Sequence, residues 1–225
     1  PTTGTLQAGA EKTYTIPVDV KATATTGPDT FWAVVDVHEP STGRDYTVED
    51  TDVNDAWTVQ NRPDVTIPKV VVAPDTSSTG QQNLSVKVVV SNTSENYRAD
   101  AQINSVELIV RKDGEPFTDQ FNISRLNEPT LPILLQGGNK LEFEFNVDVK
   151  SDAESGNYDF YARVNGEDVN DGLAFQITAV DTPGSLTVQT MGQLNIPQIW
   201  MIPDTISELQ AHGKLYVEFN NSGQA

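Results

Sequence analysis

Apolar and polar residues alternate along residues 141–150. Leu141, Phe143, Phe145, Val147 and Val149 take every second position, and a polar residue stands at each step between them. A period of two is typical of a β-strand with one buried face and one solvated face. The pattern therefore predicts a half-buried strand.

Residues 12–21 carry the same pattern, and both stretches end on Val-Asp-Val-Lys. Val18 and Val147 are 129 positions apart, and residues 1–96 align with residues 130–225 at this offset without a gap. Matching pairs recur along the overlap: Gly27 with Gly156, Phe31 with Phe160, Ile67 with Ile196, Pro74 with Pro203 and Asn92 with Asn221. The sequence therefore predicts an internal repeat of 129 residues.

Residues 61–189 form the one full copy of this repeat. We expect strands in it at residues 66–73, 84–91, 106–111, 116–123, 141–149, 158–164 and 173–180. The Lys-Asp-Gly turn between the third and fourth of these is typical of a β-hairpin. The Val-rich run at 84–91 predicts burial on both faces. Because no stretch has a helical period, short strands separated by turns predict an all-β sandwich.

The flanking parts match only portions of that copy. Residues 1–60 match its C-terminal part, with strands expected at 14–21, at 31–37 and between 46 and 59. Residues 190–225 match its first two strands. Pro17 cannot donate a backbone hydrogen bond, which favours a sheet edge or a bulge for the first strand. Two interpretations stay open: a piece of a longer array, or a fibre in which neighbouring chains complete the partial copies by strand addition.

Three short motifs resemble those of tandem immunoglobulin-like, adhesion-type repeats in bacterial and archaeal cell-surface proteins. They are Ile-Pro followed by Pro-Asp, a Val-rich strand that ends in Ser-Asn-Thr or Asn-Asn-Ser, and the late strand Gly-Asn-Tyr-Asp-Phe-Tyr-Ala-Arg-Val. The resemblance covers the whole chain. It implies tandem immunoglobulin-like β-sandwiches that serve as stalks, adhesins, surface-layer parts or carbohydrate-binding accessories.

The composition narrows the choice of partners. The chain has 225 residues and a net charge of −18, with 32 acidic and 14 basic residues. Such a surface repels nucleic acid and anionic lipid, whose phosphates need clustered Lys and Arg. No apolar run approaches the length of a membrane span. With no cysteine, the chain has neither disulfides nor thiolate metal sites. It opens at Pro1 without a methionine or an apolar leader, so we expect a removed signal or a piece of a longer protein.

Two acidic stretches are candidate calcium ligands. Calcium prefers six to eight oxygen ligands, and alternating carboxylates and amides supply several. The candidate metal ligands are Asp50, Asp52, Asn54, Asp55, Asp168, Asn170 and Asp171. The two stretches do not align with each other in the repeat, so an ordinary acidic turn is the alternative. We predict no other cofactor.

The remaining candidates point away from catalysis. His38 and His212 have no histidine at the matching repeat position and no triad or zinc spacing, which favours surface histidines. Trp32, Trp57 and Trp200 match apolar or aromatic residues, which favours packing over a sugar-stacking platform. The candidate glycosylation sites, in Asn-X-Ser/Thr sequons, are Asn83, Asn92, Asn122 and Asn220.

These observations predict a structural protein and not an enzyme. We expect a secreted, extracellular or cell-surface assembly module (a stalk, surface-layer or fibre element) whose partners are neighbouring repeats or copies of itself. A head-to-tail filament through strand complementation would complete the partial copies. The alternative is an adhesin module for a surface glycan or receptor, and a third hypothesis is a noncatalytic segment of a secreted hydrolase.

Overall fold

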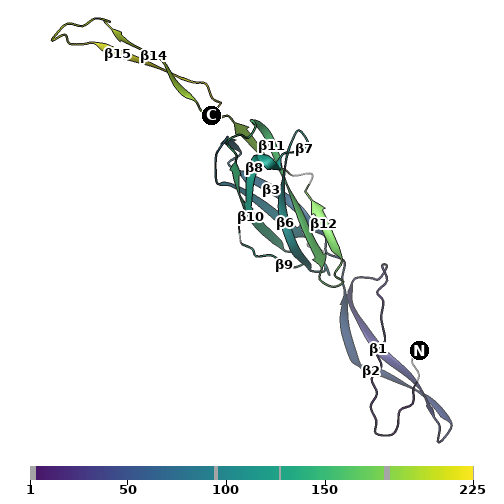
Figure 1. The fold of residues 1–225 in the computed structure, drawn as a ribbon. Coiled ribbons are helices and arrows are strands. Elements are labelled where there is room, and N and C mark those ends of the chain that lie inside the picture. Colours follow the sequence, from purple (N-terminus) through teal and green to yellow (C-terminus); the bar gives the residue numbers. More distant parts are fainter. Residues whose placement is uncertain (1–3, 94–95, 127, 180–182, 225) are drawn as a thin grey trace. The chain divides into compact units, whose positions relative to one another are not determined.

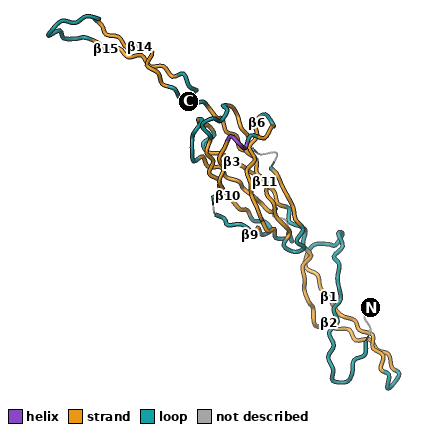
Figure 2. Tube along the Cα trace, viewed as in Figure 1, coloured by secondary structure: helices purple, strands orange, loops and turns teal. Residues whose placement is uncertain are grey.

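The computed structural model describes residues 4–93, 96–126, 128–179 and 183–224, with the side chains of residues 51–56 left out. Within these ranges every regular element is a strand except η1 (Thr118–Gln120), a single 3₁₀ turn. Figure 2 shows strands over most of the trace. The predicted all-β fold class is confirmed.

The chain divides into two compact units, Pro1–Asn61 and Arg62–Ala225. The second unit contains two sheets around a shared apolar core, whose strands can be followed in Figure 1. The first sheet has the order β3 (Val65–Ala73), β5 (Leu84–Asn92), β10 (Lys140–Val149) and β8 (Phe121–Arg125). All three strand pairs in it are antiparallel.

The second sheet is built around β11 (Gly156–Asp168). Its order is β4 (Thr76–Ser78), β13 (Gly184–Gln189), β11, β6 (Ala101–Lys112) and β7 (Glu115–Pro116). In addition, β12 (Ala174–Thr178) pairs with β11, and β9 (Ile133–Leu135) pairs with β6. Only the β4–β13 pair is parallel.

The alternating strand predicted at 141–150 is β10, at the middle of the first sheet. Phe143, Phe145, Val147 and Val149 are buried, and the residues between them are half-buried. They pack toward the apolar residues of β11, among them Tyr158 and Phe160. Alternation along β10 thus places one face on the core and leaves the other for polar contacts.

The outer face of β5 is more open than predicted. Val86, Val88 and Val90 are fully buried, but Lys87 is exposed and Val89 only half-buried. The outer residues form a polar ladder with β10 instead, in which Lys87 Nζ lies 2.8 Å from Glu142 and Ser85 donates to Glu144 at 2.7 Å. The prediction of burial on both faces was wrong because no layer covers this side of β5 among the described residues.

The hairpin predicted over residues 106–123 is also only partly correct. β6 and β7 pair at Arg111–Pro116 and Lys112–Glu115, as the Asp-Gly turn suggests. After η1, however, the chain crosses to the first sheet, where β8 pairs with β10. The turn signal predicts the reversal of the chain but not the sheet to which the next strand belongs.

The first unit consists of a long hairpin preceded by a segment of turns and loop. β1 (Gly27–Glu39) and β2 (Arg44–Val59) pair antiparallel around a turn at Gly43, whose φ of +68° suits glycine. The rings of Phe31 and Trp57 lie 4.7 Å apart. Residues 4–26 contain no strand, so the strand predicted at 14–21 does not form in this structure.

The difference between residues 14–21 and β10 has a physical reason. β10 has β5 on one side and β8 on the other. Among the described residues, no strand pairs with residues 14–21, and Tyr14, Ile16, Val18 and Val20 are exposed. An alternating pattern becomes a strand only where a neighbouring strand satisfies its backbone groups.

The two sheets that share the apolar core, from β3 to β13, form a sandwich, and a second hairpin follows it in the chain. β14 (Leu194–Ile202) and β15 (Lys214–Asn221) pair antiparallel, and the rings of Trp200 and Tyr216 stack at 5.3 Å. Every residue of both strands is exposed.

We expect Phe143→Ala to lower the free energy of unfolding of the sandwich by about 3–5 kcal/mol, because it opens a cavity in the core. Tyr14 lies 129 residues before Phe143 in the sequence but is exposed, so Tyr14→Ala in a dilute sample should change stability by less than about 0.5 kcal/mol. Urea unfolding of both variants measures the difference. Equal losses would contradict the assigned core.

Candidate functional site

The first acidic candidate stretch lies in a strand and not in a loop. β2 runs from Arg44 to Val59 and pairs with β1 on both sides of a register shift, at which Phe31 lies opposite Asp55 and Ala33 lies opposite Asp50. Asp50 is exposed and lies opposite Ala33. The side chains of Asp52, Asn54 and Asp55 lie outside the described residues.

The second acidic stretch forms a tight turn after β11. Asp168 is buried, and its Oδ1 accepts the Asn170 backbone N–H at 2.9 Å. Asp171 accepts the Leu173 backbone N–H at 2.8 Å and pairs with Arg62 at 3.1 Å. These carboxylates close the turn, as Asp residues do in Asx turns. Across the described residues, no three His, Cys, Asp or Glu side chains gather as a metal site would need.

Asn92 is a structural residue at the end of β5. It is fully buried, its Nδ2 donates to the carbonyls of Ala99 and Leu135, and its Oδ1 accepts the Asp64 N–H. This amide connects the start of β3, the end of β5 and the strand β9. The folded sandwich therefore offers a glycosylating enzyme no access to Asn92, whereas Asn83, Asn122 and Asn220 are exposed.

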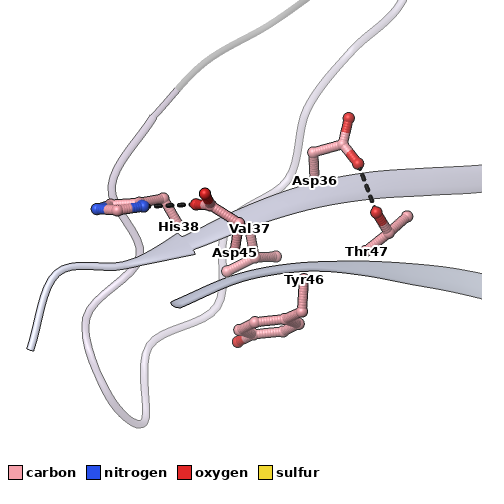
Figure 3. Close-up of a pocket in the computed structure, with 6 residues that line it drawn as sticks. All are labelled: Asp36, Val37, His38, Asp45, Tyr46 and Thr47. Atoms are coloured by element: carbon pink, nitrogen blue, oxygen red, sulfur yellow. Dashed lines mark hydrogen bonds and ion pairs between the residues drawn. The ribbon is translucent and has the colours of Figure 1, made fainter. Parts of the chain in front are cut away.

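His38 lies on the first hairpin beside a shallow hollow (Figure 3). Its Nδ1 lies 2.6 Å from Asp45, the residue opposite it on β2. Thr47 donates to Asp36 at 2.8 Å, and not to His38. Both partners of the His38–Asp45 pair are largely exposed, at 62% and 83%. Water surrounds the pair, so the arrangement lacks the desolvated setting in which a His–Asp pair activates a nucleophile. His212 is exposed in the loop between β14 and β15.

Lys112 forms a polar corner of the sandwich that sequence reasoning missed. Its Nζ lies 2.9 Å from Glu154, donates to the Ser155 carbonyl, and lies 5.4 Å from the ring centre of Tyr158. The hydrogen bond to Glu154 raises the pKa of Lys112. Burial raises the pKa of the Tyr158 hydroxyl, which donates to the Glu154 carbonyl at 2.6 Å. The three groups come from separate strands and loops, and nothing in their spacing signals the contact.

Packing of the tryptophans differs from the prediction. Trp32 is 61% exposed and Trp200 is 37% exposed, although Trp200 stacks on Tyr216. Trp57 is half-buried against Phe31. The expectation was packing in a core or at a domain junction, and Trp32 lies in no core, since neither hairpin carries a second layer among the described residues.

The hairpins β1–β2 and β14–β15 each have an exposed apolar face. Leu215 and Phe219 on β15 are 63% and 59% exposed, whereas the matching residues of the sandwich, Val86 and Val90, are fully buried. On the first unit, Phe31 and Val35 are 43% and 52% exposed, and their matches Phe160 and Val164 are fully buried. Residues with core chemistry thus face solvent on both hairpins. Extended apolar faces of this kind mark interaction surfaces.

Comparisons with known proteins give no family. No protein-family model and no curated protein matches the chain. Among solved structures it matches a family 123 glycoside hydrolase from Clostridium perfringens at 16% identity, with a TM-score of 0.31 over 52% of this chain. The match spans 22% of that enzyme's length, and a similarity of this size carries no argument about fold or activity. No helix in the described part of the chain is long and apolar enough to cross a membrane.

We expect the sandwich to lose stability above about pH 10. A folded-state pKa above the ordinary value stabilises the fold below that value, and the contribution disappears as the pH rises through it. The pKa of Lys112 is raised above its ordinary value of 10.5, and the pKa of Tyr158 is raised above 10.0. Both groups therefore lose their protons, and their contribution to stability, in the alkaline range. Tyr158→Phe should flatten the alkaline fall in the unfolding free energy, because it removes one ionisable group.

Tyr97, which is 44% exposed, provides the matched control. Tyr97→Phe should keep the alkaline slope of the natural chain. Urea unfolding between pH 8 and pH 11 measures all three proteins. An unchanged slope in Tyr158→Phe would exclude the Tyr158 hydroxyl as a source of the alkaline fall.

Proposed function

We propose that this chain is a structural assembly module of a secreted cell-surface protein, built from tandem immunoglobulin-like β-sandwiches. In this proposal it acts without catalysis, as a stalk, surface-layer or fibre element, and its partners are copies of itself or neighbouring repeats. The single observation that carries the proposal is the pair of exposed apolar hairpins. Their residue types suit an interior and would gain from association.

The strand order supports an immunoglobulin-like assignment. In the constant-type immunoglobulin fold one sheet has the order A-B-E-D and the other contains C, F and G. If the main strands are lettered A to G in the order in which they occur in the chain, the first sheet β3-β5-β10-β8 reads A-B-E-D. The second sheet then contains β6, β11 and β13 as C, F and G. β4, parallel to β13, is an additional short edge strand beside G.

Backbone details support the 129-residue repeat in the first hairpin. Gly27 pairs with Val59 as Gly156 pairs with Val188, and Val34 pairs with Glu49 as Arg163 pairs with Thr178. β1 and β2 therefore have the pairing of β11 with β13 and β12. The turn glycines Gly43 and Gly172 have φ values of 68° and 70°.

The second hairpin supports the repeat in the same way. β14 and β15 begin 129 residues after β3 and within one residue of that offset from β5. The register shift between Thr66 and Lys69 has its counterpart between Asn195 and Gln198. Asn83 and His212, at matching positions, both have positive φ, 61° and 74°.

An adhesin module for a glycan or receptor is the second candidate. Exposed Trp32 and the stacked Trp200–Tyr216 pair favour it, because aromatic rings bind sugar faces. Tryptophan fluorescence that is quenched by a glycan, and whose quenching saturates as the glycan concentration rises, would support this alternative over self-association.

We expect the sedimentation coefficient of the chain to rise with protein concentration, because apolar hairpin faces become covered on association. Each copy carries a charge of −18, so added salt should strengthen association by screening repulsion. Sedimentation velocity at low and high salt measures both effects. Monomers at every concentration and salt level would overturn the proposal.

The proposal involves no cofactor, although calcium remains a candidate from the acidic stretches. Because Asp168 and Asp171 already accept N–H hydrogen bonds, we expect the melting temperature to be the same with calcium and with a chelator. Calorimetry under both conditions measures it. A melting temperature that rises with calcium would assign a calcium site and add a cofactor to the proposal.

A further inference from the structure

We propose that the partner of hairpin β14–β15 is the first unit of a second copy of this chain, with residues 12–18 of that copy paired antiparallel to β15. This inference rests on the proposed assembly function and gives it a partner and a strand register. The resulting contact joins two different surfaces, so copies would associate head to tail.

The template for this contact lies inside the sandwich. There β10 pairs antiparallel with β5, and Phe143, Phe145 and Val147 lie opposite Val88, Val86 and Leu84. The offset of 129 residues carries β10 to residues 11–20 and β5 to residues 213–221, which contain β15. Tyr14, Ile16 and Val18 of one copy would then lie opposite Val217, Leu215 and Gly213 of the other, with apolar side chains on the inner face.

The exposure of these residues fits the proposed contact. Ile16 is 69% exposed and its match Phe145 is 3% exposed; Leu215 is 63% exposed and its match Val86 is fully buried. In the sandwich, Phe145 and Val86 lie opposite each other. Residues 12–18 match the part of β10 that holds Phe145, and β15 matches the part of β5 that holds Val86. Among the described residues, neither segment pairs with the strand that its match has in the sandwich.

The polypeptide around Pro17 is suited to this pairing. Leu126 N–H donates to the Glu144 carbonyl and Lys150 N–H to the Gln120 carbonyl, so even-numbered residues of β10 direct their backbone groups toward the β8 side. Pro17 matches Asn146, an even-numbered position. Its missing N–H would therefore face away from β15. Tyr14, Ile16 and Val18 keep the backbone groups that the pairing needs.

An edge position for residues 12–18 follows from the sequence as well. In the sandwich, β8 covers the other side of β10. Pro17 has no N–H to donate on the side of residues 12–18 that corresponds to β8, and proline is tolerated on the open side of an edge strand. In the proposed contact, residues 12–18 would thus form the outer strand of the shared sheet. A second copy supplies the strand that β15 lacks and accepts the proline without loss.

A disulfide between single-cysteine variants tests the register, because the natural chain has no cysteine. Thr13 and Glu218 match Glu142 and Val89, which lie opposite each other in the template. Cα atoms at such positions are about 4.5–5.5 Å apart, within disulfide reach. We expect a mixture of the Thr13→Cys and Glu218→Cys proteins to oxidise to the mixed dimer, seen by non-reducing electrophoresis and mass spectrometry.

Asp19→Cys supplies the register control. Asp19 lies six residues beyond Thr13, so its Cα would be about 20 Å from position 218 in the proposed pairing. The mixture of Asp19→Cys with Glu218→Cys should give at least about tenfold less mixed dimer. Equal yields from the two mixtures would overturn the register, and so would a double Thr13→Cys/Glu218→Cys chain that closes only on itself.

A second variant tests the apolar face without cysteine chemistry. Leu215→Asp should abolish concentration-dependent sedimentation, whereas Glu218→Gln on the polar face should retain it. Oligomers that persist in Leu215→Asp would overturn this contact and leave the assembly function standing. So would a mixture of Thr13→Cys and Glu218→Cys proteins that forms oligomers but no mixed disulfide. Absence of oligomers in the natural chain would overturn both.

Discussion

The structure depends on one constraint: a β-strand with one apolar face is stable only when a neighbouring strand satisfies its backbone and a second layer covers its side chains. Residues 141–149 and 12–20 have the same alternation. The first stretch has partners on both sides and forms β10, while the second has none among the described residues and forms no strand. The hydrophobic effect and backbone hydrogen bonding must act together for the same pattern to become the same structure.

The sandwich satisfies this constraint internally and uses its charges for other purposes. Its inner faces are apolar, and the carboxylates of Asp168 and Asp171 accept backbone N–H hydrogen bonds that close a turn. Lys87 pairs with Glu142 at the surface, and an exposed pair of this kind contributes little to stability. Stability therefore resides in the core, in the corner around Lys112, whose side chain is 17% exposed, and in Asn92, whose buried amide connects three chain segments.

Much of the fold could be predicted from the sequence, because alternation and turn residues are local signals. The strands around 84–91, 141–149 and 158–164 were found in this way. The crossover after residue 116 was missed, since the choice of sheet depends on distant partners. β9 is not among the predicted strands, because three residues are too few for a periodic signal. The corner around Lys112 and the burial of Asn92 depend on tertiary contacts that spacing does not encode.

Pro17 connects the constraint to the form of the proposed assembly. An unpaired strand edge is a template for uncontrolled sheet growth, and natural proteins protect such edges with proline or charge. In the proposed contact, the edge of residues 12–18 that faces β15 keeps its backbone N–H donors. The opposite edge lacks one backbone N–H donor, because Pro17 has none. Growth of the sheet sideways would then be disfavoured where growth head to tail is allowed. The net charge of −18 acts in the same direction, because it opposes loose contacts that bury too little apolar surface to offset the repulsion.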